Sequence, residues 1–126
     1  MSAGPIAYAR ADLAAALEKA QALPVHVTMP ERLEPPCIVI TEGTPLLEQG
    51  DSFGSVTVRL DANIVAAPVA DNDLAIARLD AAVDEIAAAL LHDWTIQVDA
   101  YQGVTTADSQ RYIAARLTVS TTLTIS

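Results

Sequence analysis

Two long stretches alternate between apolar and polar residues, and this alternation limits the fold more than any other feature of the chain. The first is "SVTVRLDANIVAA" at 55–67, and the second is "YIAARLTVSTTLTIS", which begins at 112. Successive side chains of a β-strand point to opposite faces, so each stretch predicts a strand with one face on an apolar core. The other face of the closing strand is mostly hydroxyl side chains and holds one charge: Tyr112, Ala114, Arg116, Thr118, Ser120, Thr122 and Thr124.

Two other stretches have apolar residues at helical spacing. In 71–91 these residues form a single stripe, and Asp71 or Asn72 can cap the helix. Residues 8–22 carry a shorter stripe, and Pro24 ends that helix. The longer helix is expected to pack on the sheet through Ile76, Leu79, Val83, Ile86 and Leu90.

Three shorter stretches predict further strands: "VHVT" at 25–28, "CIVIT" at 37–41 and "WTIQVDAY" at 94–101. Two helices with one apolar stripe each can cover only one face of a sheet. The predicted fold is therefore α+β, a mainly antiparallel sheet of about four to five strands with two helices on one face. The predicted order is α-β-β-β-α-β-β, in a single domain that covers 1–126.

Glycine and proline interrupt the pattern between 42 and 54, which predicts a loop or a loosely extended arm. This segment also carries Leu46, Leu47 and Phe53, which are costly to leave in water. We therefore expect an arm that is mobile in the free subunit and ordered by a neighbour. The alternative is that these residues fold back onto the core.

Element lengths predict that the strands extend past the helices. A helix of 71–91 is about 32 Å long, whereas strands over 55–67 and 111–125 reach about 43–50 Å. Such strands either bend at a bulge or pack against another chain. Both outcomes are compatible with the sequence.

Composition sets the class of protein. A chain of 126 residues fits one domain, and its single cysteine, Cys37, excludes an intramolecular disulfide. We see no signal peptide and no membrane-spanning stretch, so we expect a soluble protein of cytosolic origin. Sixteen acidic residues against seven basic ones give a net charge of −9, which argues against sequence-specific DNA binding and against membrane binding.

No arrangement of residues predicts catalysis. His26 and His92 are far apart in the sequence and form no ligand motif, and Cys37 opens an apolar strand, where a cysteine is usually a small buried hydrophobe. The carboxylates Asp80, Asp84 and Glu85 lie opposite the apolar stripe of their helix, which predicts an acidic face exposed to solvent. We therefore expect no catalytic residue, no metal and no cofactor.

Three stretches carry a family resemblance: "PPCIVITEGTPLLEQGDSFGSVTVRLDANIVAA", "DNDLAIARLDAAVDEIAAALL" and "VDAYQGVTTADSQRYIAARLTVST". A proline-led strand and a loop precede a long strand, then a helix, a further loop and a final strand opened by a tyrosine. In this order the chain resembles the tail terminator (tail completion) proteins of long-tailed bacteriophages. The likeness covers nearly the whole chain and rests on element order, because the family has no invariant motif.

The resemblance implies a structural virion protein with no turnover. In that family a hexameric ring caps the tail tube, stops its polymerisation and provides the surface that docks the filled head. The implied partners are further copies of the chain, the tail tube protein and the head–tail connector proteins, with DNA only passing through a channel and with no membrane. The ring would be assembled in the host bacterial cytoplasm and would lie at the head-proximal end of the virion tail. The expected subunit interface is Leu46, Leu47, Phe53, Tyr112, Arg116, Thr118 and Thr122.

Two other functions stay open. One is another phage neck component, such as a head-completion connector, and the other is a small α+β ligand-binding or enzyme domain. Within the sheet or across a subunit boundary, Arg116 is expected to pair with an acidic residue such as Asp61 or Asp99.

Overall fold

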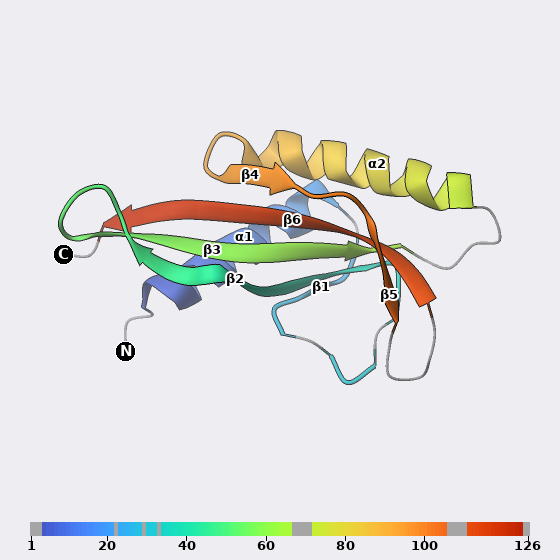
Figure 1. The fold of residues 1–126 in the computed structure, drawn as a ribbon, viewed down its shortest axis with the longest axis horizontal. Coiled ribbons are helices and arrows are strands. Elements are labelled where there is room, and N and C mark those ends of the chain that lie inside the picture. The colour runs from blue at the N-terminus through green and yellow to red at the C-terminus, as the bar shows by residue number, and fades with distance from the viewer. Residues whose placement is uncertain are drawn as a thin grey trace.

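The chain is an α+β protein in which two helices cover one side of a six-stranded sheet (Figure 1). The computed structural model describes residues 4–21, 23–28, 30–32, 34–66, 72–105 and 111–124. In chain order the elements are α1 (Pro5–Ala20), β1 (Val25–His26), β2 (Cys37–Gln49), β3 (Ser55–Val65), α2 (Asn72–Leu90), β4 (Thr95–Val98), β5 (Gln102–Thr105) and β6 (Arg111–Thr124).

The sheet has the strand order β1-β2-β3-β6-β4, and β5 also pairs with β6. The α+β class is confirmed, but the sheet is mixed and has one strand more than the sequence predicted. β1 runs parallel to β2, whereas the other pairs are antiparallel. The additional strand is β5, whose sequence "QGVT" is too short and too polar to show alternation. The proposed cap Asp71 and the last strand residue Ile125 lie outside the described residues.

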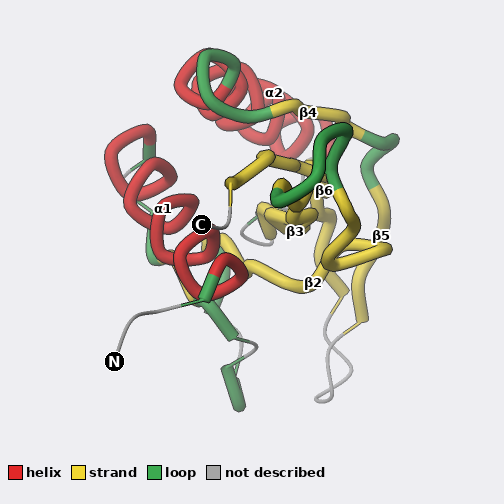
Figure 2. The backbone as a smooth tube through the Cα atoms, turned by 90° about the vertical axis from the view of Figure 1, so that its left-hand side faces the viewer, coloured by secondary structure: helices red, strands yellow, loops and turns green. Residues whose placement is uncertain are grey.

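Both helices lie on the same side of the sheet, as the view along the strands shows (Figure 2). The alternation predicted for β3 and β6 is confirmed, since one face of each strand is buried beneath the helices. Burial of this apolar area is the main stabilising contribution to such a fold. The largest fully buried side chains of this core include Leu13, Leu17, Ile38, Leu60, Ile64, Leu79, Ile86, Leu90 and Leu117.

The buried stripe of α2 differs from the prediction at its first position. Ile76 is 39% exposed, and the neighbouring Ala75 is buried in its place. Both residues continue the helical spacing to Leu79, so the apolar pattern does not distinguish between them. A small alanine at the contact lets the first turn of the helix approach the core closely.

Residues 42–49 form the second half of β2, where the sequence predicted a loop or an arm. Pairing with β3 joins Glu42 to Leu60 and resumes at Leu47, which lies opposite Val58. Between these points, residues 43–46 lie opposite Arg59 alone. A bulge of this kind accommodates glycine and proline without ending the strand, which is why their presence was misleading. Mobility of the segment in the free subunit stays a prediction.

Gly43 is required by the close approach of the bulge to β3. A Cβ atom at this position would lie 2.7 Å from Cβ and 2.8 Å from the backbone oxygen of Arg59. We expect Gly43→Ala to lower the free energy of unfolding by about 1–3 kcal/mol, measured by chemical denaturation. Gly103→Ala is the control, because the nearest atom to its Cβ would be 4.0 Å away. Equal stability of the two variants would contradict this account of the bulge.

Candidate functional site

The sheet face opposite the helices is a broad polar surface built from three neighbouring strands. Thr57 of β3 lies opposite Thr122 of β6, and Asp61 lies opposite Thr118. On the other side of β6, Gln97 of β4 is also opposite Thr118. Because side chains at paired positions point to the same face, these residues form continuous rows across the strands. We call this surface the hydroxyl face, and its members are Thr57, Arg59, Asp61, Asn63, Thr95, Gln97, Arg116, Thr118, Ser120, Thr122 and Thr124.

Both arginines of the hydroxyl face have an acidic partner. Arg116 Nη2 lies 3.8 Å from Asp99 Oδ2, which confirms one of the two partners expected for it. Arg59 Nη2 lies 3.4 Å from Glu48 Oε1 on β2. Exposed pairs of this kind contribute little to stability, but they neutralise the face locally.

Three of the uncharged side chains of the face, Thr57, Asn63 and Thr122, form hydrogen bonds. The hydroxyls of Thr57 and Thr122 are 3.1 Å apart. Asn63 Nδ2 donates to Val39 O at 3.0 Å and to Thr41 Oγ1 at 2.9 Å. A surface of mainly short polar side chains can pack closely against another surface, which a dense array of long lysines and glutamates does not allow.

Tyr112 has a different environment from the rest of the predicted interface. It is half-buried against a small apolar cluster of Cys37, Val39, Val65 and Ala114. This cluster closes one end of the hydroxyl face within the subunit. Tyr112 therefore has a core role that the sequence interpretation missed.

The β2–β3 hairpin and the end of β6 extend past both helices (Figure 1). β4 pairs with β6 only from Leu117 to Ser120, so residues 121–124 have no strand on that edge among the described residues. Leu47 is 43% exposed on the extension, whereas Leu46 folds back against the core. The predicted overhang is present, and it carries an exposed apolar side chain.

The turn of this hairpin holds Phe53 in water, with 98% of the side chain exposed. Hydrogen bonds close the turn: Gly50 N donates to Ser55 O at 2.9 Å, and Ser55 Oγ donates to Ser52 O at 2.7 Å. Gly54 has a φ of 84°, which a residue with a side chain rarely adopts. The hydrogen-bonded turn therefore presents the phenyl ring to solvent at the tip of the overhang.

The predicted interface residues thus fall into three places. Arg116, Thr118 and Thr122 lie together on the hydroxyl face, and Leu47 and Phe53 lie on the overhang. Leu46 and Tyr112 belong to the packing of the subunit itself. The sequence interpretation did not include the β3 and β4 members of the hydroxyl face in the interface, although the alternation of 55–67 and of "WTIQV" would have identified them.

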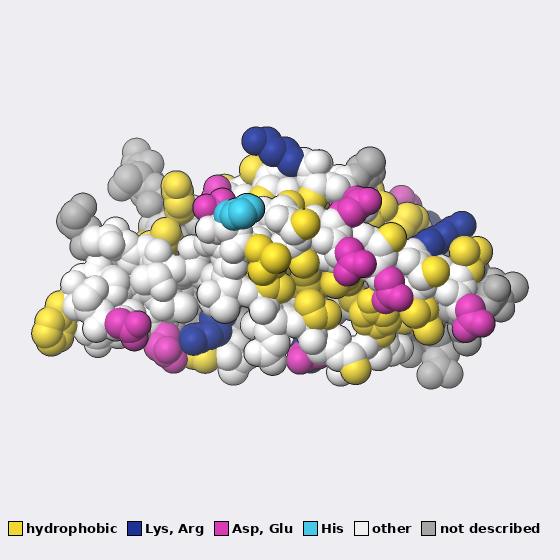
Figure 3. Space-filling view, turned by 90° about the horizontal axis from the view of Figure 1, so that it is seen from above, with side chains coloured by type: hydrophobic (Ala, Val, Ile, Leu, Met, Phe, Trp, Pro, Cys, Tyr) yellow, Lys and Arg dark blue, Asp and Glu magenta, His cyan; other side chains and the backbone are white. Residues whose placement is uncertain are grey.

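The surface over α2, seen from above, mixes hydrophobic and acidic side chains with a few basic ones (Figure 3). Two acidic residues of α2 hold other segments in place: Tyr101 donates a hydrogen bond to Asp80, and Gln21 donates one to Glu85. Burial, the hydrogen bond to Asp80 and the negative charges of Asp80 and Asp84 raise the pKa of Tyr101 to about 12. These carboxylates connect elements and do not converge on a shared pocket.

Two observations describe the groups that most often carry chemistry in the described part of the chain. Cys37 is fully buried, and burial raises the pKa of its thiol, which favours the unreactive protonated form. Within the described residues, no three His, Cys, Asp or Glu side chains come close enough to hold a metal ion. Neither helix in that part of the chain is long and apolar enough to cross a bilayer.

Comparison with known proteins adds no family. The sequence matches no model of a known protein family, and no curated protein is similar to it at a significant level. The hydroxyl face and the overhang are the two surfaces of the structure that bear on function.

Proposed function

We propose that this chain is a structural protein of a phage tail, similar to the tail terminators, and that it acts by assembling into a ring. The observation that carries the proposal is the hydroxyl face together with the overhang: a sheet whose helices cover one side only and that extends past those helices. A ring of such subunits would cap the tail tube, stop its growth and present a docking surface to the head.

The composition of the hydroxyl face supports a contact. Solvated sheet faces usually carry many charges, especially lysine, which keep the protein soluble and discourage pairing between sheets. Here the rows along β3 and β6 are mainly short polar side chains, and both arginines are paired with acids. Such a face accepts either water or a close-packed neighbour, and the exposed Phe53 beside it favours the neighbour.

The charge of the chain fits a ring through which DNA passes. A net charge of −9 repels the phosphate backbone, so DNA would move through the channel without binding to its wall. In this proposal the chain has no catalytic activity, and its partners are its own copies, the tail tube protein and the connector proteins of the head. It would act at the head-proximal end of the tail.

Two measurements test the proposal. Native mass spectrometry over a range of protein concentrations should show a closed oligomer, with six copies implied by the resemblance. Added to growing tubes of the tail tube protein from the same genome, the purified chain should arrest elongation, as seen in tube lengths by electron microscopy. A closed oligomer that leaves tube length unchanged and binds a head connector would instead indicate a different neck component. A protein that stays monomeric both alone and in the presence of tubes would refute the proposal.

A further inference from the structure

The two ends of β3 carry complementary features. Phe53 lies two residues before Ser55, the first residue of the strand. At the other end of the strand, the last residues, Ile64 and Val65, line a hollow. A strand of this length spans about 36 Å at 3.3 Å per residue. Phe53 is therefore far from the hollow of its own subunit, and only another copy of the chain can bring the two together.

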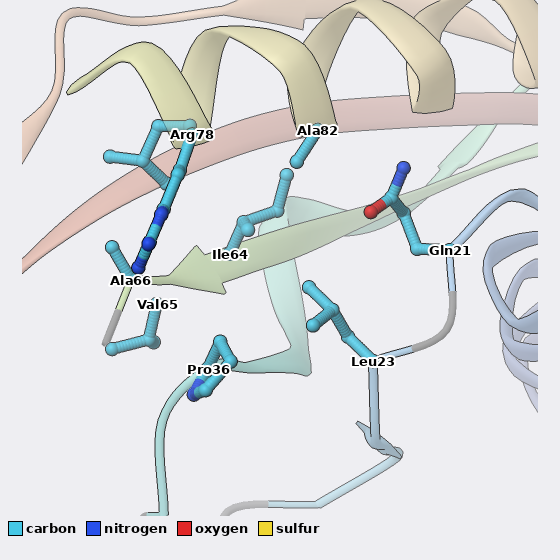
Figure 4. A pocket seen from close by; sticks show the side chains of 9 residues that line it. Gln21, Leu23, Pro36, Ile64, Val65, Ala66, Arg78 and Ala82 are labelled. Atoms are coloured by element: carbon cyan, nitrogen blue, oxygen red, sulfur yellow. The ribbon is translucent and has the colours of Figure 1, made fainter. Parts of the chain in front are cut away.

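The hollow lies between the end of the sheet and the two helices, with a volume of about 200 Å³ (Figure 4). Its floor is apolar and buried: Ile64, Leu79 and Ala82. Half-buried Leu23 and exposed Arg78 form part of its rim. An apolar cavity of about 150 Å³ is large enough to bind benzene, so a phenyl ring fits this volume.

We infer that Phe53 of one copy inserts into the Leu23–Ile64–Leu79 hollow of the next copy. Charge supports this choice of occupant. Asp51 lies on the same exposed turn as Phe53, and Arg78 lies on the rim of the hollow. No ion pair joins Asp51 or Arg78 to another residue in the described part of the chain. An inserted turn would bring these opposite charges to the same rim.

The resulting contact is head-to-tail, because it joins two different surfaces of the same chain. Such contacts close into rings when the rotation between subunits allows it. The inference deepens the proposed function, on which it rests, by naming the anchor of the ring. A buried aromatic side chain in a pocket is the usual form of such an anchor, while the surrounding contacts contribute area and exclude water.

Two single variants and their mixture test the anchor. Phe53→Ala removes the phenyl side chain and leaves the hollow intact, whereas Ala82→Leu fills the hollow and leaves Phe53 intact. Each alone should weaken self-association by at least about 30-fold, measured by sedimentation velocity. A one-to-one mixture should form dimers and nothing larger, because it offers a single competent contact. Leu91→Ala, at an exposed leucine outside both surfaces, should assemble like the parent.

A charge exchange keeps the test independent of how well Ala82→Leu folds. Asp51→Arg and Arg78→Asp should each weaken association, and the double variant should recover most of it. Normal assembly of Phe53→Ala, or a parent protein that is monomeric at every concentration, would overturn the inference. So would a mixture that forms no dimers or a double variant that shows no recovery. If Phe53→Ala still forms the oligomeric ring and still arrests tube growth, Phe53 is not the anchor of the subunit contact, whereas the proposed function stands.

Discussion

Truncating Ile86 to alanine is expected to lower the free energy of unfolding by about 2–5 kcal/mol. Ile86 is 0% exposed at the centre of the buried stripe of α2, in the core formed with the sheet. The variant loses the burial of the removed methyl and methylene groups and leaves a cavity that a packed core fills only in part. Urea denaturation followed by circular dichroism measures the loss.

Ile76→Ala on the same helix is the matched control. It removes the same atoms from a side chain that is 39% exposed, so we expect a loss of less than about 1 kcal/mol. A small effect at both positions would contradict the placement of α2 on the sheet. A large effect at Ile76 would restore the stripe that the sequence predicted.

Replacing Thr118 and Thr122 together by lysine is expected to abolish assembly and to leave the fold intact. Thr118 lies in the middle of the hydroxyl face, between Asp61 and Gln97, and Thr122 lies nearer the overhang. Two lysines at these positions fit a face in water, but at a packed contact they would bury two long charged side chains. A lysine at 118 would lie opposite Asp61, whereas one at 122 would lie opposite Thr57 and have no acid opposite it, which is strongly unfavourable. Circular dichroism should match the parent, while the oligomer seen by native mass spectrometry should disappear.

The control adds the same charge elsewhere. Ala81→Lys with Ala88→Lys places two lysines on the exposed side of α2. This variant should assemble like the parent, because lysine is a good helix former and the side chains point into water. If both double variants assemble, the hydroxyl face is merely solvated. If both fail, the added charge is responsible and not the position of the threonines.

The parts of the fold that follow from periodicity were predictable. Alternation along β3 and β6 fixed which side chains face the helices, because a strand has only two faces and one of them must be buried. The same alternation identified Thr118 and Thr122 as neighbours on the helix-free face. Of the two partners expected for Arg116, Asp61 and Asp99, the structure shows the pair with Asp99. Each of these features depends on local spacing.

Features that depend on contacts between distant segments were not predictable. Gly43 and Pro45 are residue types that usually form turns. However, β2 pairs with β3 on both sides of them, so β2 continues through this segment. The hollow is lined by segments around Leu23, Ile64 and Leu79, which come together only when the helices pack. No pattern within any one of these segments indicates a cavity.

The bulge in β2 has a geometric consequence for an assembly. Residues 43–46 occupy a length of sheet that Arg59 occupies alone on β3, so the outer edge of the hairpin contains more chain than its neighbour. Two paired strands of unequal length bend toward the shorter one, and a bulge also increases their twist. In a closed ring, each subunit is rotated by the same angle relative to the subunit before it. The four residues of the bulge would therefore help to set the curvature, and hence the number of copies, of the ring.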